Sequence, residues 1–290
     1  MTLRNLLVGA LAVVSLAACG TTSTPSTDSG KIRIVASTNV WASVVKAVGG
    51  DEVDVKALLD DPSADPHSYE SKPADAALVK DAKLVVFNGG GYDDFFAKLI
   101  TGDAQKKIEA FPLRKHDKDG NEHVWYEFDA VRAVAEAAAN ELGAIKPDKK
   151  TTFESNTQQF TAKLEELGKK VDGIGRGKKV VATEPIAHYL LDATGVEDVT
   201  PEAFSKAVEE QSDVPAAALA SINQLVEGKQ ANVLVDNTQT ENQVTKQLVE
   251  KAKAAGVPVV AVTETLPEGV TGYLDWMSKQ VDALSQALKA

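Results

Sequence analysis

A long amphipathic segment near the middle of the chain constrains the fold more than any other feature. Between residues 149 and 173, apolar residues recur three, four or seven positions apart among polar neighbours, which is the spacing of one face of an α-helix. These residues are Phe153, Phe160, Leu164, Leu167, Val171 and Ile174. Three repeats are few for a coiled coil, and glycines at positions 173, 175 and 177 end the pattern. We therefore expect one long helix that runs along two flanking regions.

Both flanking regions alternate short apolar runs with helix-length segments. The apolar runs predict strands at residues 32–36, 53–59, 84–87 and 108–111 before the long helix, and at 179–182, 196–200, 232–235 and 257–262 after it. Helical patterns cover residues 40–48, 73–80, 92–100 and 129–143, and then 186–193, 215–227, 240–255 and 272–288. Such alternation favours parallel sheets that are covered by helices.

The sequence therefore predicts an α/β fold of two lobes, each with a parallel-type sheet flanked by helices, joined by one long rigid backbone helix. We place the N-terminal lobe at residues 32–148, the linking helix at 149–175 and the C-terminal lobe at 176–290. A chain of 290 residues is long enough to build two such cores.

The first 31 residues have the pattern of a targeting signal followed by a tether. After Arg4, the apolar run at 6–18 is too short to span a membrane comfortably as a mature helix. It ends in Leu16-Ala17-Ala18-Cys19-Gly20, which resembles a bacterial lipobox. The resemblance implies a lipoprotein signal peptide at 1–18 and a lipid on Cys19 that anchors the protein to the cell membrane, outside the cytoplasm. Residues 19–31 are rich in Ser and Thr, which predicts a flexible tether.

Composition and charge exclude several classes of partner. The chain has 42 acidic and 31 basic residues and a formal net charge of −11, so it repels nucleic acid and has no basic face for anionic lipid. A cation is the electrostatically natural ligand. Cys19 is the only cysteine, which excludes an intrachain disulfide. We expect a monomer.

Four polar residues follow predicted strands and could bind such a cation. His67 lies in the loop after the strand at 53–59, while Glu184, Asp236 and Glu264 follow the strands at 179–182, 232–235 and 257–262. Because ligands bind beyond the carboxyl ends of parallel strands, we expect these side chains to converge on facing edges. One carboxylate at a strand end is more often a helix cap, so their joint placement is what indicates a binding site.

Four motifs, in their order and spacing, resemble the metal-specific solute-binding lipoproteins of bacterial ABC importers. They are Asp65-Pro66-His67-Ser68-Tyr69-Glu70, His123-Val124-Trp125-Tyr126, Thr183-Glu184-Pro185 and Thr263-Glu264-Thr265-Leu266-Pro267. The resemblance covers residues 32–288. It implies a periplasmic-binding-protein-like fold of the metal-binding type, with one divalent transition metal ion between the lobes and an ABC transporter permease as partner.

The resemblance also implies a set of metal ligands. His67 and His123 would come from the N-terminal lobe, and Glu184 and Glu264 from the C-terminal lobe. Glu264 stands where family members usually have Asp, which keeps Asp236 as an alternative ligand.

This ligand set bears on the metal and on the mechanism. Two imidazoles and two carboxylates suit Mn²⁺, while Zn²⁺ binds such a set tightly by the Irving–Williams order. We expect one divalent transition metal ion as cargo, manganese first and zinc second. Asp65 and Glu70 are then expected to shape the loop and orient His67. Metal that bridges the lobes would stabilise a closed form, which the permease opens.

Two other functions stay open from the sequence. A metallo-enzyme would use the same residue types, although four protein ligands close a site and no His-Glu-x-x-His motif occurs. A surface adhesin active in cell adhesion, or a binder of a non-metal solute, would suit the same fold. We expect His188 to be a packed or surface residue, and whether His116 assists metal loading stays open from the sequence. The acidic loop around His116 lacks the twelve-residue calcium-binding pattern.

Overall fold

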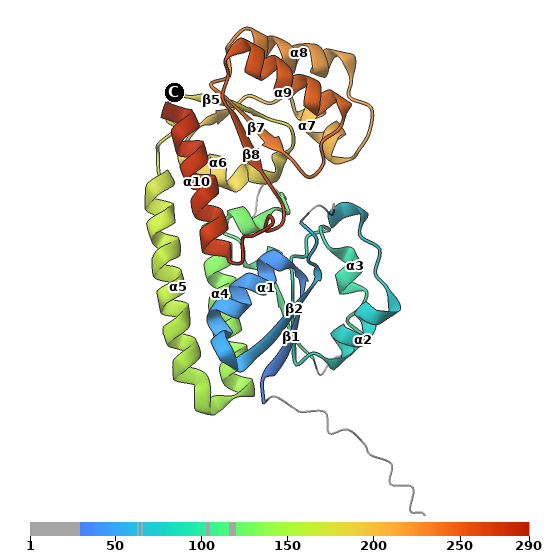
Figure 1. Cartoon of the computed structure of the whole chain (residues 1–290), viewed down its shortest axis with the longest axis vertical. Helices are drawn as coiled ribbons and strands as arrows, with labels where there is room; N and C mark the ends of the chain where they lie inside the picture. The colour runs from blue at the N-terminus through green and yellow to red at the C-terminus, as the bar shows by residue number, and fades with distance from the viewer. Residues whose placement is uncertain (1–29, 63, 65, 103–104, 116–119, 290) are drawn as a thin grey trace, which may run out of the picture. The chain divides into compact units, whose positions relative to one another are not determined.

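Two parallel sheets of four strands form the framework of the chain (Figure 1). The computed structural model describes residues 30–62, 64, 66–102, 105–115 and 120–289, with the backbone but not the side chain of His67. Within these residues, the first sheet has the strand order β2-β1-β3-β4 and the second has the order β6-β5-β7-β8. Their bounds are β1 (Ile32–Thr38), β2 (Val53–Leu59), β3 (Leu84–Phe87), β4 (Lys106–Glu109), β5 (Lys179–Ala182), β6 (Glu197–Asp198), β7 (Val233–Asn237) and β8 (Val259–Val262).

Neighbouring strands are parallel in both sheets, so the carboxyl ends within each sheet meet at one edge. In the second sheet, Ala182 of β5 pairs with Val235 of β7, and Asn237 of β7 pairs with Val262 of β8. This register brings the segments that follow β5, β7 and β8 together.

Helices connect the strands and cover the sheets. They are α1 (Asn39–Gly49), α2 (Pro73–Asp81), α3 (Asp94–Ala97), α4 (Phe128–Ile145), α5 (Lys150–Val171), α6 (His188–Thr194), α7 (Glu202–Glu209), α8 (Ala216–Glu227), α9 (Gln243–Ala255) and α10 (Tyr273–Lys289). Single 3₁₀ turns occur at η1 (Gly50–Glu52), η2 (Pro66–Ser68), η3 (Phe111–Leu113), η4 (Val124–Tyr126), η5 (Pro147–Lys149) and η6 (Pro185–Ala187). None of the helices in the described part of the chain has the length and hydropathy that a membrane span requires.

The predicted long helix is α5, which packs against α4 and α10 (Figure 1). Its buried face consists of Phe153, Thr157, Phe160, Leu164, Leu167 and Val171, which recur at the three- and four-residue spacing of one helical face. The prediction of two parallel sheets flanked by helices, with one long helix between them in sequence, is confirmed.

One continuous hydrophobic core joins the two sheets. It includes Trp41 of α1, Val86 of the first sheet, Val233 and Val260 of the second sheet, and Trp276 of α10, all of them buried. Two smaller clusters lie apart from this core, one around Phe204 and Ile222 and the other around Val85 and Phe96. Separating the sheets would expose this core to water, and exposing apolar surface costs about 25 cal/mol of free energy for each Å².

The bounds of several elements differ from the sequence prediction, most clearly those of α3, β6 and β7. The helix predicted at 92–100 is limited to α3, because the Asp93 carboxylate accepts the backbone N–H groups of Asn88 (2.6 Å) and Gly89 (2.8 Å) and holds a turn before it. The strand predicted at 196–200 is reduced to the two residues of β6, at the edge of its sheet. Strand β7 extends to Asn237, so Asp236 lies within this strand rather than after it.

Helix α7 has no counterpart in the sequence prediction. Its apolar residues Phe204, Ala207 and Val208 are buried. The apolar residues do recur at helical spacing, but an eight-residue segment is shorter than the window of about 11–18 residues over which that spacing identifies a helix. Packing against the second sheet's smaller core stabilises the helix instead.

Candidate metal site

Two buried carboxylates meet at the carboxyl edge of the second sheet. Glu184 follows β5 and Glu264 follows β8, as expected, and both side chains are at most 3% exposed. The amide nitrogen of Asn237, at the end of β7, donates to Glu184 Oε2 (2.6 Å) and to Glu264 Oε1 (2.9 Å). The amide nitrogen of Asn237 therefore holds the two carboxylates close to each other.

Further hydrogen bonds hold Asn237 and Glu184 in this arrangement. Asn237 donates its backbone N–H to Thr183 Oγ1 (2.9 Å), and its Oδ1 accepts the backbone N–H of Gln239 (3.1 Å). The hydroxyl of Thr240 donates to Glu184 Oε1 (2.5 Å). Because an ionised carboxylate only accepts hydrogen bonds, the amide of Asn237 must present its nitrogen to the pair. The sequence prediction missed Asn237, whose only signal was its position next to a strand-end carboxylate.

His123 is fully buried and its imidazole is oriented by Asn121. Asn121 Oδ1 accepts the backbone N–H of His123 (2.9 Å) and lies 3.0 Å from its Nδ1, while Asn121 Nδ2 donates to the carbonyl of Pro185 (3.0 Å). An amide oxygen is an acceptor, so the imidazole carries its proton on Nδ1 and leaves the lone pair on Nε2 for a metal ion. Asn121 thus joins His123 to the residue that follows Glu184.

The carboxylate of Glu209 lies near His123, and the sequence prediction missed it. Its Oε1 lies 3.9 Å from His123 Nε2. Within the described residues, Glu122, His123 and Glu209 each offer one donor atom, and these atoms lie within 4.8 Å of one another. Glu209 is at the end of α7, the helix whose sequence pattern is too short to predict, so no sequence signal placed it here.

The loop that carries His67 is hydrogen-bonded to Gln239, whose side chain also contacts the backbone of Glu264. Gln239 Nε2 donates to the carbonyls of Pro62 (2.8 Å) and Ala64 (3.4 Å), which precede His67. After His67, the Tyr69 hydroxyl donates to Asp75 Oδ2 (2.9 Å). Burial first, and then the hydrogen bond to Asp75, raises the pKa of Tyr69 to about 12.

Several predicted residues lie outside the described residues or away from the carboxylate pair. The side chain of His67, together with Cys19, Asp65 and His116, is outside the described residues. Glu70 is exposed. His188 begins α6, half-buried, with its ring 5.2 Å from that of Tyr189. This is the packed environment that was expected for it.

Asp236 is buried in β7, next to the residue that bridges the two carboxylates. Successive side chains of a strand point to opposite faces, so Asp236 and Asn237 face opposite ways. Burial is the main cause that raises the pKa of Asp236 to about 7, and the charges of Glu241 and Glu184 add to it, while a hydrogen bond from Thr183 opposes the shift. Asn237 is the β7 side chain that contacts the pair.

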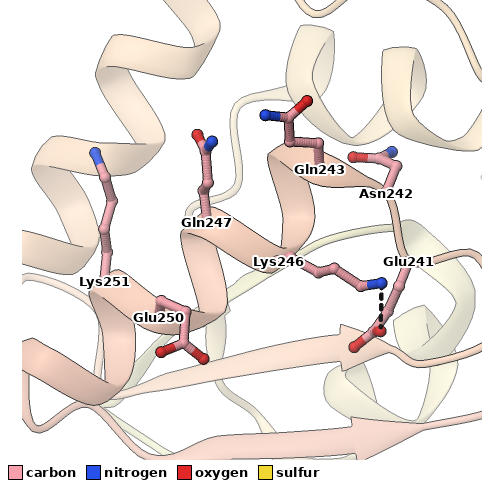
Figure 2. Close-up of a pocket in the computed structure, with 7 residues that line it drawn as sticks. All are labelled: Glu241, Asn242, Gln243, Lys246, Gln247, Glu250 and Lys251. Carbon is pink, nitrogen blue, oxygen red and sulfur yellow. Dashed lines mark ion pairs between the residues drawn. The ribbon is translucent and has the colours of Figure 1, made fainter.

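An open hollow of about 710 Å³ lies along α9 (Figure 2). Its lining consists of Glu241, Asn242, Gln243, Lys246, Gln247, Glu250 and Lys251. Lys246 Nζ lies 3.6 Å from Glu241 Oε2, and Figure 2 marks this ion pair with a dashed line. The hollow contains none of the predicted ligands, and we read it as a solvated helix face.

Comparisons with known proteins give the relatives of the chain. The family described as zinc-uptake complex component A, periplasmic (ZnuA), matches residues 34–287. The iron ABC transporter substrate-binding lipoprotein MtsA of Streptococcus pyogenes serotype M1 is 29% identical over 248 residues, covering 74% of this chain and 80% of that protein. The manganese ABC transporter substrate-binding lipoprotein scaA of Streptococcus gordonii is 29% identical over 287 residues, covering 91% and 83%. The structure of the periplasmic zinc-binding protein TroA from Treponema pallidum matches with a TM-score of 0.72 at 18% identity, covering 89% and 99%, which concerns the fold alone.

Proposed function

Because the chain belongs to the zinc-uptake complex component A family, we propose that it captures a divalent transition metal ion outside the cytoplasmic membrane and delivers it to the permease of an ABC importer. The observation that carries this proposal is the buried pair Glu184 and Glu264, which meets at one amide. Burying two carboxylates is costly unless donors or a cation compensate their charge. A divalent cation supplies two positive charges at that place.

The proposed ligands are His67, His123, Glu184 and Glu264. The tautomer of His123 supports its role, because Nε2 keeps the lone pair that a metal ion needs. The burial of both glutamates supports theirs, since water competes little for their oxygens. Asp236 remains the alternative to Glu264.

The choice of metal follows from the ligand types. Relatives are named for iron and manganese, and a structural neighbour for zinc. Two carboxylates beside two imidazoles favour Mn²⁺ over the softer ions, whereas a simple titration favours Zn²⁺ by the Irving–Williams order. We place manganese first and zinc second as the transported ion.

Delivery requires the metal to leave a buried site. One hydrophobic core contains residues of both sheets and of the helices beside them, so rotating the sheets apart would expose apolar surface of that core. Release through movement of the loops that carry the ligands costs less. A permease that pulls on these loops would open the site without separating the sheets.

The remaining parts of the proposal concern the setting of the protein. A lipid on Cys19 and the tether at 19–31 would keep a monomer near the permease. With zinc, which is usually four-coordinate, four protein ligands would leave no position for a reacting substrate, which favours a binding protein over an enzyme.

Metal content and titration test the proposal. The full chain, purified without chelator, should contain close to one equivalent of manganese or zinc by elemental analysis. His123→Ala and Glu184→Ala should each abolish high-affinity Mn²⁺ binding in calorimetry, while circular dichroism stays unchanged. The matched controls are His188→Ala and Glu197→Ala, at residues outside the proposed ligand set. If either ligand variant binds with the stoichiometry and affinity of the wild type, the site assignment is wrong.

A further inference from the structure

The side chain of Gln239 makes hydrogen bonds at both ends of its amide. Its Oε1 accepts the backbone N–H groups of Glu264 (2.5 Å) and Thr265 (3.1 Å). Its Nε2 donates to Thr265 Oγ1 (2.7 Å) and to the carbonyls of Pro62 (2.8 Å) and Ala64 (3.4 Å). Backbone N–H groups only donate and carbonyls only accept, so these partners determine which end of the amide is which.

Gln239 thereby links two segments that are far apart in the sequence. Pro62 and Ala64 belong to the loop that carries His67, and Gln239 follows β7 in the second sheet. We call the hydrogen bonds from Gln239 Nε2 to Pro62 and Ala64 the latch. On its other side, the same amide holds the backbone of Glu264 itself. The latch therefore sets the distance between the loop of one proposed ligand and the backbone of another.

We propose that Gln239 is a positioning residue whose latch holds the His67 loop against Glu264 and slows the escape of bound metal. The inference rests on the proposed function. Metal leaves only when ligands on the two sides separate, and the latch must break for the His67 loop to move away from Glu264. The amide itself needs no contact with the metal.

Two substitutions remove the latch, one with a new charge and one without. Gln239→Glu keeps an oxygen to accept from Glu264 and Thr265 but places a second acceptor against the carbonyls of Pro62 and Ala64, so it removes the latch. Gln239→Met has similar length, removes every hydrogen bond and adds no charge. Gln243→Glu, in the first turn of α9, makes the same charge change at an exposed residue and is the control.

The experiment follows Mn²⁺ from the loaded full chain into excess chelator by stopped flow. Gln239→Glu and Gln239→Met should each release Mn²⁺ about tenfold faster than the wild type, and Gln243→Glu at the wild-type rate. Tenfold corresponds to about 1.4 kcal/mol, the size of one or two hydrogen bonds. The association rate should change by less than about twofold, because the latch acts after the metal is bound.

The possible results distinguish a latch from other roles. If Gln239 only stabilised the fold, its variants would bind fewer equivalents of Mn²⁺ and release them at the wild-type rate, which would overturn the inference. Slower release from Gln239→Glu alone would mean that charge acts on the metal, and would overturn it as well. If the wild type binds neither Mn²⁺ nor Zn²⁺, the proposed function itself fails. Normal wild-type binding with unchanged release from both variants refutes the latch alone.

Discussion

Replacing Asn237 with leucine should destabilise the metal-free protein more than any other loss of a single amide near the site. Leucine has the same branching as asparagine, so the substitution removes the donors with little change in volume. The lost hydrogen bonds are those that the amide donates to Glu184 (2.6 Å) and Glu264 (2.9 Å), and the one that Oδ1 accepts from the backbone N–H of Gln239 (3.1 Å). Both carboxylates are buried, so water cannot replace the amide.

The magnitude follows mainly from the two bonds to the carboxylates. A hydrogen bond to a charged group contributes roughly 1.5–3 kcal/mol, so losing these two should lower the free energy of unfolding by about 3–6 kcal/mol. For a chain of this size, each kcal/mol lowers the Tm by roughly 2–4 °C. The Tm of the chelator-treated variant at pH 7 should therefore fall by about 6–24 °C in calorimetry.

Asn156→Leu is the matched control for this prediction. Asn156 makes one hydrogen bond to a neutral acceptor, the carbonyl of Val48 (2.9 Å), and its loss should cost about 1 kcal/mol. Equal losses of stability in the two variants would refute the reasoning, because they would mean that the carboxylates do not depend on Asn237.

Three further predictions concern packing and charge. Glu52→Gln should lower the free energy of unfolding at pH 7, because hydrogen bonds from Lys146 and Lys149 lower the pKa of Glu52 to about 2. This stabilisation is complete above about pH 4.5 and is lost as the pH falls towards 2. In urea unfolding, the difference in stability between the wild type and Glu52→Gln should therefore be smaller at pH 3 than at pH 7. An equal difference at the two pH values would contradict the ion pair. Tyr126→Phe removes the hydrogen bond to the carbonyl of Thr263 (2.9 Å) and should cost about 1 kcal/mol in urea unfolding, so no measurable change would count against this link. Phe153→Ala empties a buried position of α5 and should cost about 3–5 kcal/mol by the same assay, whereas a loss below 1 kcal/mol would show that α5 is loosely packed.

The order of elements along the chain could be predicted from the residues alone because it depends on local periodicity. The spacing of Phe153, Phe160 and Leu164 predicted α5 with its start one residue early and its end two to four residues late. Glu184 and Glu264 could be assigned to one edge, because parallel strands bring their carboxyl ends together whatever the details of packing. His123 follows no predicted strand, and only its motif indicated a role.

The hydrogen bonds that organise the site depended on the folded chain. Gln239 lies 177 positions from Pro62, and Asn121 lies 64 positions from Pro185, so no local pattern reports these partners. The register of β7 against β5 and β8 decided that Asn237, and not Asp236, contacts both carboxylates. A residue's own sequence determines its local conformation, whereas the partner of a buried polar group depends on which distant segments pack beside it. That is why the sequence located the proposed glutamate ligands while packing selected the amides that hold them.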